Sequence, residues 1–368
     1  MKKVFITGVG LNAEIASSLA FLSKVNVDSL PVKQPIENDS DLYQKNINFR
    51  SGGSIKREDR TLLNDCAKLS IDAATDAFLM AEMRTPYTPE EKSNFPIFMA
   101  NESIENNFTA VETFSKNHRN ENGDILWDEL GKIKELLNPL DMLRLLSTNP
   151  LYHVSKYLGL HGGGYPIRRM SLSGLTALEE AFYSLPMRAE RALVLGTGDL
   201  KTSENLCAFK KMSLLRMNGN ENGIIPSYAS AAIVLEHTVE DLTRNAYAEL
   251  VAVRSMFRPE SRVSVSDWKE LYEIFPRLES EALTVICYNN GVNDLASEEY
   301  NAMRDIFPNA QLLDYKKYYG YTGKANNLID LITVLNDKRV ALGSYVAING
   351  VGMSVGHGYI LLRKLAHI

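Results

Sequence analysis

Short apolar runs alternate with helical apolar stripes along the first half of the chain. Segments 4–8, 95–100, 165–170 and 192–196 are apolar runs bounded by glycine or polar residues, a pattern typical of strands. Apolar side chains recur at three- and four-residue steps across residues 60–83, which predicts a helix with one buried face, and segment 174–185 predicts another. Segment 115–137 is rich in Asn, Lys and Glu, so we expect a surface excursion there that ends in a short helix.

The second half of the chain repeats this alternation. Strands are predicted at 230–236, 247–254, 284–288, 340–348 and 359–363, with helices at 298–307 and 324–335. Because strands and helices alternate on both sides of residue 240, we expect a layered α/β architecture with helices on mainly parallel sheets.

Charge and cysteine content exclude several function classes. The 40 Lys and Arg residues against 45 Asp and Glu residues give a formal net charge of −5, which offers no electrostatic footprint for nucleic acid or an anionic membrane. Cys66, Cys207 and Cys287 contain no CxxC pair, so we expect neither a disulfide framework nor a zinc site, and no other cofactor. All apolar stretches fall short of the ~18 residues of a membrane span, so a cytoplasmic protein without membrane insertion is expected.

The N-terminus carries a possible dinucleotide-binding pattern. Gly8-Val9-Gly10 follows a predicted strand, and Asp28 lies near the spacing of a ribose-binding acid. Segment 152–156 is a YxxxK that resembles the catalytic motif of short-chain dehydrogenases. That family's glycine turn would require glycine where Asn12 and Glu14 stand, so an NAD(P)-dependent oxidoreductase is a distant alternative. A tight strand-to-helix turn explains the glycines more simply, because glycine tolerates positive φ.

Several segments, in the same order along the chain, resemble the β-ketoacyl synthases, a thiolase-fold family. The strongest is 170–175, Met-Ser-Leu-Ser-Gly-Leu, which is similar to that family's nucleophile elbow at the start of a helix. Segments 4–10, 138–163, 289–291, 321–324 and 350–352 fall in the family's order. The resemblance implies an α/β thiolase-like fold of two pseudo-repeated halves in a layered αβαβα core. The N-terminal half would span 1–240 and carry the elbow, and the C-terminal half would span 241–368.

The same resemblance implies that the residues for condensation are missing. Ser171 stands at the position of the cysteine nucleophile, Asn290 and Lys324 at those of two histidines, and Tyr319 at that of a lysine. Val351 replaces a gating phenylalanine. A serine hydroxyl gains too little from a helix dipole to ionise near neutral pH, and it would require a general base within reach. We therefore expect no catalytic residue for condensation in this chain.

This pattern resembles the chain-length-factor subunits of type II polyketide and aryl-polyene synthases. It implies a non-catalytic subunit that pairs with an active ketosynthase, as a heterodimer or heterotetramer, works with an acyl carrier protein, and shapes the acyl tunnel in polyketide or fatty-acid-type biosynthesis. Segments 100–113 and 139–148 match the tunnel wall. The latter carries the apolar side chains Leu140, Met142, Leu143, Leu145 and Leu146. Ordinary core or dimer packing would explain these side chains equally well.

A serine enzyme is the alternative from a different class. His153 and His161 precede the elbow, and either could act as the base for Ser171 in an acyltransferase or hydrolase. A histidine before a glycine turn is more often structural, and the sequence leaves this alternative open.

Overall fold

The computed structural model describes residues 3–18, 22, 24, 26–37, 45–83, 86–101, 108–137, 139–217, 220–238, 246–278 and 282–368. Within these residues, ten strands form one sheet in the order β3-β2-β4-β5-β1-β6-β10-β9-β7-β8. The first five strands are β1 (Lys3–Ala13), β2 (Ile97–Asn101), β3 (Gly164–Ile167), β4 (Arg191–Asp199) and β5 (Tyr228–Thr238). The other five are β6 (Ala248–Met256), β7 (Leu283–Ile286), β8 (Gln311–Leu313), β9 (Tyr345–Gly352) and β10 (Gly356–Lys364).

The two halves of the sheet repeat one strand order. From one edge the first five strands run β3-β2-β4-β5-β1, and from the opposite edge the last five run β8-β7-β9-β10-β6. The first strand of each half, β1 and β6, pair with each other and join the halves through Val4 and Leu250. The expected repetition of two α/β halves is confirmed, whereas the boundary expected at residue 240 lies outside the described residues.

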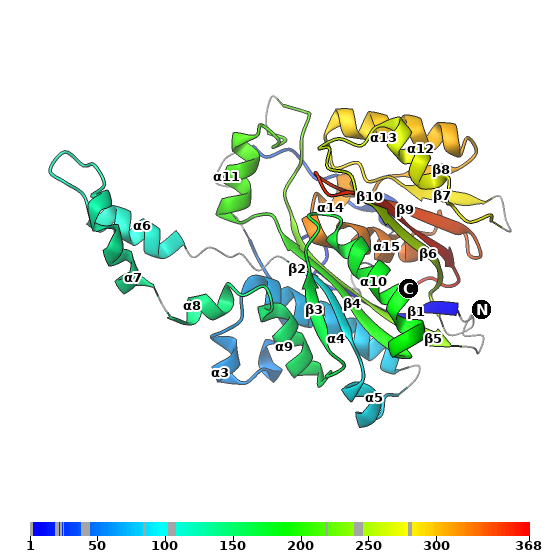
Figure 1. Ribbon diagram of the computed structural model, residues 1–368, viewed down its shortest axis with the longest axis horizontal. Coiled ribbons are helices and arrows are strands. Elements are labelled where there is room, and N and C mark those ends of the chain that lie inside the picture. The colour runs from blue at the N-terminus through cyan, green and yellow to red at the C-terminus, as the bar shows by residue number, and fades with distance from the viewer. Residues whose placement is uncertain are drawn as a thin grey trace.

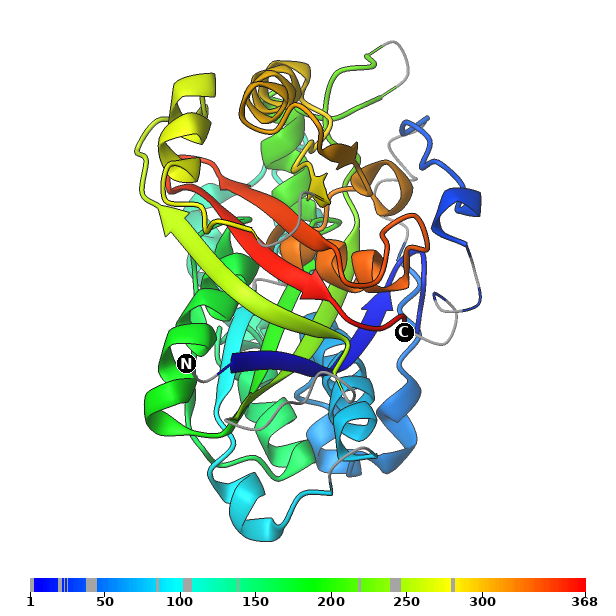
Figure 2. The ribbon, with the colours of Figure 1, turned by 90° about the vertical axis from the view of Figure 1, so that its right-hand side faces the viewer.

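Helices divide the fold into layers (Figures 1 and 2). α10 (Ser173–Arg188) and α15 (Asn326–Asn336) lie between the two halves of the sheet, in a core that both halves share. α4 (Asp65–Glu82) and α9 (Asn149–Leu158) cover the outer face of the first half. α12 (Val265–Tyr272) and α13 (Asn293–Ile306) cover the outer face of the second half. The expected αβαβα layering is therefore confirmed.

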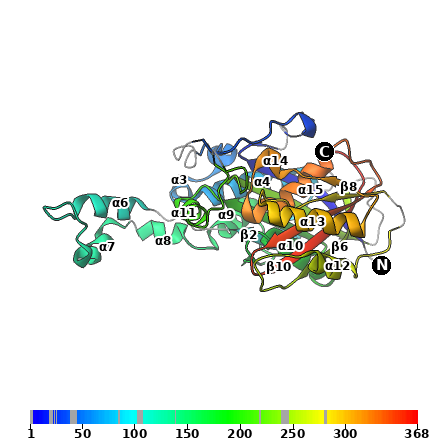
Figure 3. The ribbon, with the colours of Figure 1, turned by 90° about the horizontal axis from the view of Figure 1, so that it is seen from above.

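The described residues between 108 and 146 form an arm that projects from the body of the molecule (Figures 1 and 3). The arm contains α6 (Phe108–Asn117), η3 (Trp127–Lys132), α7 (Ile133–Leu136) and α8 (Pro139–Arg144), so the surface excursion expected at 115–137 is confirmed. Short helices elsewhere are η1 (Val27–Ser29), η2 (Arg50–Ser54), α3 (Arg57–Arg60), α5 (Pro89–Ser93), α11 (Ser203–Lys211), α14 (Lys316–Tyr319) and η4 (Gly323–Ala325). None of the helices in the described ranges combines the length and the apolar character needed to cross a bilayer.

The sheet is mixed, so the expectation of mainly parallel strands is wrong. β2 pairs in parallel with β3 and β4, and β7 pairs in parallel with β8 and β9. The other pairs, each of which involves β1, β5, β6 or β10, are antiparallel. β10 must run antiparallel to β9 because only residues 353–355 connect them. The apolar pattern of a strand predicts its burial but not its direction.

Gly8 and Gly10 lie inside β1, directly beneath α4. A Cβ atom on Gly8 would come within 2.1 Å of the Ala77 carbonyl oxygen, and one on Gly10 within 2.0 Å of the Ala73 carbonyl oxygen. These glycines therefore allow the helix to lie close to the strand, and the interpretation as a strand-to-helix turn is wrong. Both glycines lie within β1, which continues to Ala13, so they do not form the phosphate-binding turn that a dinucleotide-binding oxidoreductase would need.

Candidate functional site

The elbow at 170–175 forms the turn that leads into α10. Met170 adopts a left-handed backbone conformation, with φ at +50°, which is strained for a residue other than glycine. The Ser173 hydroxyl donates to the Met170 carbonyl at 2.6 Å and accepts from the Arg169 N–H at 2.7 Å, so it fixes this turn. A Cβ atom on Gly174 would lie 2.5 Å from the Lys324 carbonyl oxygen, so the glycine lets α10 begin against η4.

Ser171 is buried at this turn, with 6% of its surface exposed, and its hydroxyl is held by two neighbours. Its Oγ donates to the Val351 carbonyl at 2.6 Å and lies 3.2 Å from the Tyr288 hydroxyl. Tyr288 in turn lies 2.8 Å from the Tyr321 hydroxyl. Because the single proton of Ser171 goes to Val351, the Tyr288 hydroxyl must donate to Ser171 and the Tyr321 hydroxyl to Tyr288. We call Tyr321, Tyr288 and Ser171 the hydroxyl chain.

Tyr288 fills the space in front of the serine. It is 3% exposed, and its ring stands edge-on to that of Tyr321 with the centroids 6.2 Å apart. Burial raises the pKa of Tyr288 well above its ordinary value, so the phenol stays protonated and acts as a donor. Sequence patterns did not indicate this residue, although it lies only two residues after the buried strand β7.

No base activates Ser171 within the described part of the chain. The hydroxyl has no histidine within hydrogen-bonding distance. His153 lies on α9 and lines a separate cavity with Asp59 and Lys156, which form an ion pair at 2.7 Å. His161 is exposed at the surface. The geometry therefore lacks the base that an acyltransferase or hydrolase at Ser171 would require.

A buried carboxylate, Glu299, holds the loop that carries Tyr288. Its oxygens accept from the backbone N–H of Tyr288 at 2.7 Å and of Asn289 at 3.1 Å, and from the Asn349 side chain at 2.7 Å. Burial raises the pKa of the Glu299 carboxyl, and these three donors oppose that shift. Glu299 thus positions the loop and makes no contact with Ser171 itself.

A second buried network lies beside the first. Lys316 Nζ lies 2.6 Å from the Asp330 carboxylate and 5.2 Å from the centre of the Tyr288 ring. The other oxygen of Asp330 accepts from the Tyr319 hydroxyl. Both partners of the ion pair are almost fully buried, with 3% of Lys316 and none of Asp330 exposed. The side chains of the described residues include no cluster of His, Cys, Asp or Glu that could hold a metal ion.

Comparison with known proteins identifies the fold. No protein-family model and no curated protein matches the sequence. Among solved structures, a type II polyketide ketosynthase in complex with its acyl-carrier protein matches with a TM-score of 0.74 and 15% identity, over 99% of this chain and 100% of that chain. A β-ketoacyl synthase from Burkholderia phymatum matches with a TM-score of 0.73 and 15% identity, over 99% and 100%. The ishigamide ketosynthase/chain length factor matches with a TM-score of 0.74 and 13% identity, over 99% of both chains.

The chain has the ketosynthase fold. The thiolase-like architecture expected from the sequence is confirmed by these matches, which at such low identity establish the fold alone. At the start of α10, the turn that the sequence likened to the elbow of this fold carries Ser171.

The positions expected for the ketosynthase histidines and lysine need adjustment. Asn290 does not contact Ser171, because its side-chain oxygen accepts from the Val292 N–H at 3.1 Å, and Tyr288 takes the place beside the serine. Tyr319 is not a lone replacement for the lysine, since Lys316 supplies a buried ammonium to the same carboxylate.

Lys324 and Val351 lie next to the elbow turn. Lys324 is 6% exposed, and its Nζ donates to the Asn101 carbonyl at 3.0 Å, at the end of β2. Val351 contributes its backbone carbonyl to Ser171 rather than a gating side chain. Both residues therefore support the geometry of the elbow in its present, hydrogen-bonded form.

The expected tunnel segments lie on or next to the arm. Leu140, Leu143 and Leu146 are 39%, 45% and 51% exposed, and Leu145 is half-buried. The interpretation of the exposed leucines as core of this chain is therefore wrong. The Met142 side chain and residues 102–107 of the other expected segment lie outside the described residues.

Proposed function

We propose that this chain is a non-catalytic, ketosynthase-like subunit of the chain-length-factor type, which pairs with an active ketosynthase in the cytoplasm. The surroundings of Ser171 carry the proposal. Its hydroxyl donates its proton to the Val351 carbonyl, and the protonated Tyr288 hydroxyl lies beside it. No histidine of the described residues lies within hydrogen-bonding distance of it. A chain built in this way cannot hold an acyl group at position 171 without rearrangement.

An apolar surface supports the pairing. Large apolar side chains are exposed along the arm, among them Trp127 at 64% and Leu143 at 45%. The sheet edge beside the elbow adds to this surface, since Tyr165 in the outermost strand β3 is 47% exposed and Met187 on α10 is 79% exposed. Large apolar side chains exposed at several points of a surface are candidates for contact with a partner. A partner with the same fold, docked along β3 and the arm, would cover it.

The partner would supply the chemistry, and this chain would shape the cavity. One structure with the same fold is a ketosynthase in complex with an acyl-carrier protein, and another is a ketosynthase/chain length factor. By extension we propose that the pair receives acyl groups from a carrier protein, in polyketide, aryl-polyene or fatty-acid-type biosynthesis. The leucines of the arm, including Leu145, would then form part of the wall of the partner's acyl tunnel.

The test is co-expression with a cysteine-containing ketosynthase from the same genome, followed by native mass spectrometry and an acyl-loading assay on each subunit. We expect a one-to-one complex, or a dimer of such complexes, acylated only on the partner's cysteine. The variant Leu143→Asp should abolish the complex, because it places a charge in the buried interface. Leu342→Asp, which alters an equally exposed leucine in the loop before β9, is the matched control and should leave the complex intact.

Two results would contradict the proposal. A self-sufficient homodimer acylated at Ser171 would mean that the chain is an enzyme. Assembly with the partner that survives Leu143→Asp and truncation of the arm would mean that the exposed apolar surface has another purpose. Product length gives a further readout, since Leu145→Trp should shorten the chains made by an intact complex.

A further inference from the structure

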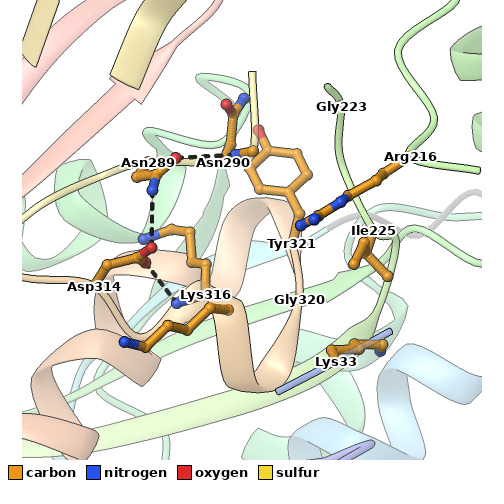
Figure 4. A pocket seen from close by; sticks show the side chains of 12 residues that line it. Lys33, Arg216, Gly223, Ile225, Asn289, Asn290, Asp314, Lys316, Gly320 and Tyr321 are labelled. Carbon is orange, nitrogen blue, oxygen red and sulfur yellow. Dashed lines mark hydrogen bonds between the residues drawn. The ribbon is translucent and has the colours of Figure 1, made fainter. Parts of the chain in front are cut away.

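A small cavity lies on the outer side of the hydroxyl chain (Figure 4). Its volume is about 80 Å³, and its wall includes Tyr321, whose hydroxyl leads inward to Tyr288. Four separate parts of the chain line it: Lys33, the residues Arg216, Gly223 and Ile225, segment 289–291 after β7, and residues between 314 and 321 after β8. The cavity therefore adjoins the elbow but is separated from Ser171 by two tyrosine rings.

The charges around this cavity are unbalanced. Four basic side chains and one acidic side chain line it: Lys33, Arg216, Lys316, Lys317 and Asp314. Lys33 is neutralised by Glu14, and Lys316 is neutralised by Asp330. Asp314 is also engaged, because its oxygens accept from the Asn289 side chain at 2.8 Å and the Lys316 N–H at 3.0 Å. Because both of those donors are neutral, Asp314 keeps its negative charge, so Arg216, Lys317 and Asp314 together leave one net positive charge at the cavity.

The guanidinium of Arg216 has no acceptor among the described residues. Its Nε is buried, yet it makes no hydrogen bond. A buried donor without a partner costs about 1–3 kcal/mol, which is a reason to expect that an anion normally satisfies it. Asn290 also lines the cavity, and its side-chain amide nitrogen is a further donor, since only its oxygen is used within the described structure.

Glycines in left-handed conformations make these walls rigid. Gly291 has φ at +97° and Gly320 has φ at +76°. A Cβ atom on Gly291 would come within 2.2 Å of the Gly223 carbonyl oxygen, and one on Gly320 within 2.7 Å of the Ile225 carbonyl oxygen. The backbone segments that form these walls are therefore packed closely against each other.

We propose that this cavity, the Arg216 pocket, binds a phosphate-class anion, either free inorganic phosphate or the phosphate of a monoester. A guanidinium forms strong paired hydrogen bonds with phosphate oxygens. Donors from three walls, Arg216, Lys317 and the Asn290 amide, suit a tetrahedral anion, whose oxygens diverge, better than a planar carboxylate. The volume equals that of a few waters, each of about 30 Å³, so it admits one phosphate group, and an ester tail would extend into solvent.

This inference does not depend on whether the chain is catalytic. The test is titration of the purified full-length chain with inorganic phosphate at constant ionic strength, followed by calorimetry and by the thermal midpoint. We expect saturable one-site binding, and at ten times the Kd the folding equilibrium should shift toward the folded state by about elevenfold. Glycerol 3-phosphate, titrated in parallel, separates the two sources. Tighter binding than inorganic phosphate would indicate an ester ligand, and weaker binding would indicate the free ion.

Two variants disable the pocket in different ways. Arg216→Gln removes the charge, and Ile225→Phe fills the cavity while leaving every charge in place. Each should weaken binding at least tenfold. Arg262→Gln, at an arginine that is 75% exposed and pairs only with an exposed Asp294 at 3.3 Å, is the matched control and should bind phosphate as the unmodified chain does. Absence of saturable binding in the unmodified chain, or binding that survives both pocket variants, would overturn the proposal.

Discussion

The substitution Asp330→Asn should leave the buried ammonium of Lys316 without a counter-charge. The two groups lie 2.6 Å apart and are almost fully buried, with the Tyr288 ring on one side of the ammonium. In Asp330→Asn the shape is kept and the amide oxygen can still accept from the Tyr319 hydroxyl. The negative charge is lost together with the acceptor that Lys316 uses, because the amide nitrogen would then face the ammonium. Removing one partner of a buried ion pair typically costs about 3–5 kcal/mol, and we expect a loss of that size in the free energy of unfolding.

A double variant separates this cause from simple loss of packing. Lys316→Met combined with Asp330→Asn removes the ammonium as well, so no charge is stranded, and most of the lost stability should return. Equilibrium urea unfolding at neutral pH, followed by circular dichroism, measures all the variants. Asp305→Asn is the matched control, because Asp305 pairs with Lys269 at 3.0 Å on the surface, and the change should cost less than about 1 kcal/mol.

The reasoning fails in either of two cases. If Asp330→Asn costs no more than the surface control, the ammonium is not held in a low-dielectric site. If the double variant is as unstable as Asp330→Asn, the loss comes from shape or hydrogen bonding and not from an unpaired charge.

Three further predictions concern other parts of the fold. Burial lowers the pKa of Lys364 from 10.5 to about 8, so the unfolded chain binds this proton more tightly than the folded chain does. The free energy of unfolding of the unmodified chain, relative to that of Lys364→Met, should therefore rise between pH 8 and pH 10.5 by at most about 3 kcal/mol. Unfolding measured at several pH values checks this. Ser171→Cys, made with Cys207→Ser to remove the exposed thiol, should resist iodoacetamide in the native state, and stoichiometric labelling by mass spectrometry would contradict this. Gly10→Ala should lower the free energy of unfolding by at least about 2 kcal/mol, whereas Gly53→Ala, which meets no atom within 4 Å, should change it little.

The sequence predicted the architecture well because that architecture depends on local patterns. Apolar runs and helical stripes identified α4, α10, α15 and most strands within a few residues. The repeated halves followed from the resemblance. Strand direction could not be predicted, since the same apolar run suits a parallel or an antiparallel neighbour. Gly8 and Gly10 were misread because a strand glycine beneath a helix and a turn glycine look alike in sequence.

The candidate site was predicted in outline and missed in detail. Lys324 and Val351 are next to glycines in sequence, and Ser171 lies three residues before Gly174, so all three could be located near the elbow from the sequence alone. Tyr288 lies in the loop after strand β7, and Lys316 begins the short helix α14 after strand β8. A shift of two or three residues in either segment would not change the apolar pattern of the sequence. Their roles emerge only from contacts between residues distant in sequence, such as Tyr288 with Ser171 and Lys316 with Asp330.

Apolar character on the arm is a related case. The sequence marked the leucines between 140 and 146 as buried somewhere, which is what apolar periodicity indicates. It could not say against which chain they are buried. In the isolated chain three of them are exposed, and the same is true of Trp127. A pattern of this kind therefore predicts burial in the assembled state, and only the structure tells which part of that burial the chain provides for itself.

The hydrogen bonds around Ser171 would oppose an ionised group at this position. An ionised nucleophile at position 171 would have no proton to donate, and it would face the Val351 carbonyl oxygen at about the 2.6 Å now spanned by a hydrogen bond. Two oxygen-like acceptors at that distance repel each other. The helix N-terminus that would favour a thiolate is still present, but the nearest backbone group now requires a donor. Restoring cysteine alone would consequently leave a neutral thiol beside a carbonyl and a tyrosine, and reactivity would also require the β9 backbone and Tyr288 to move away.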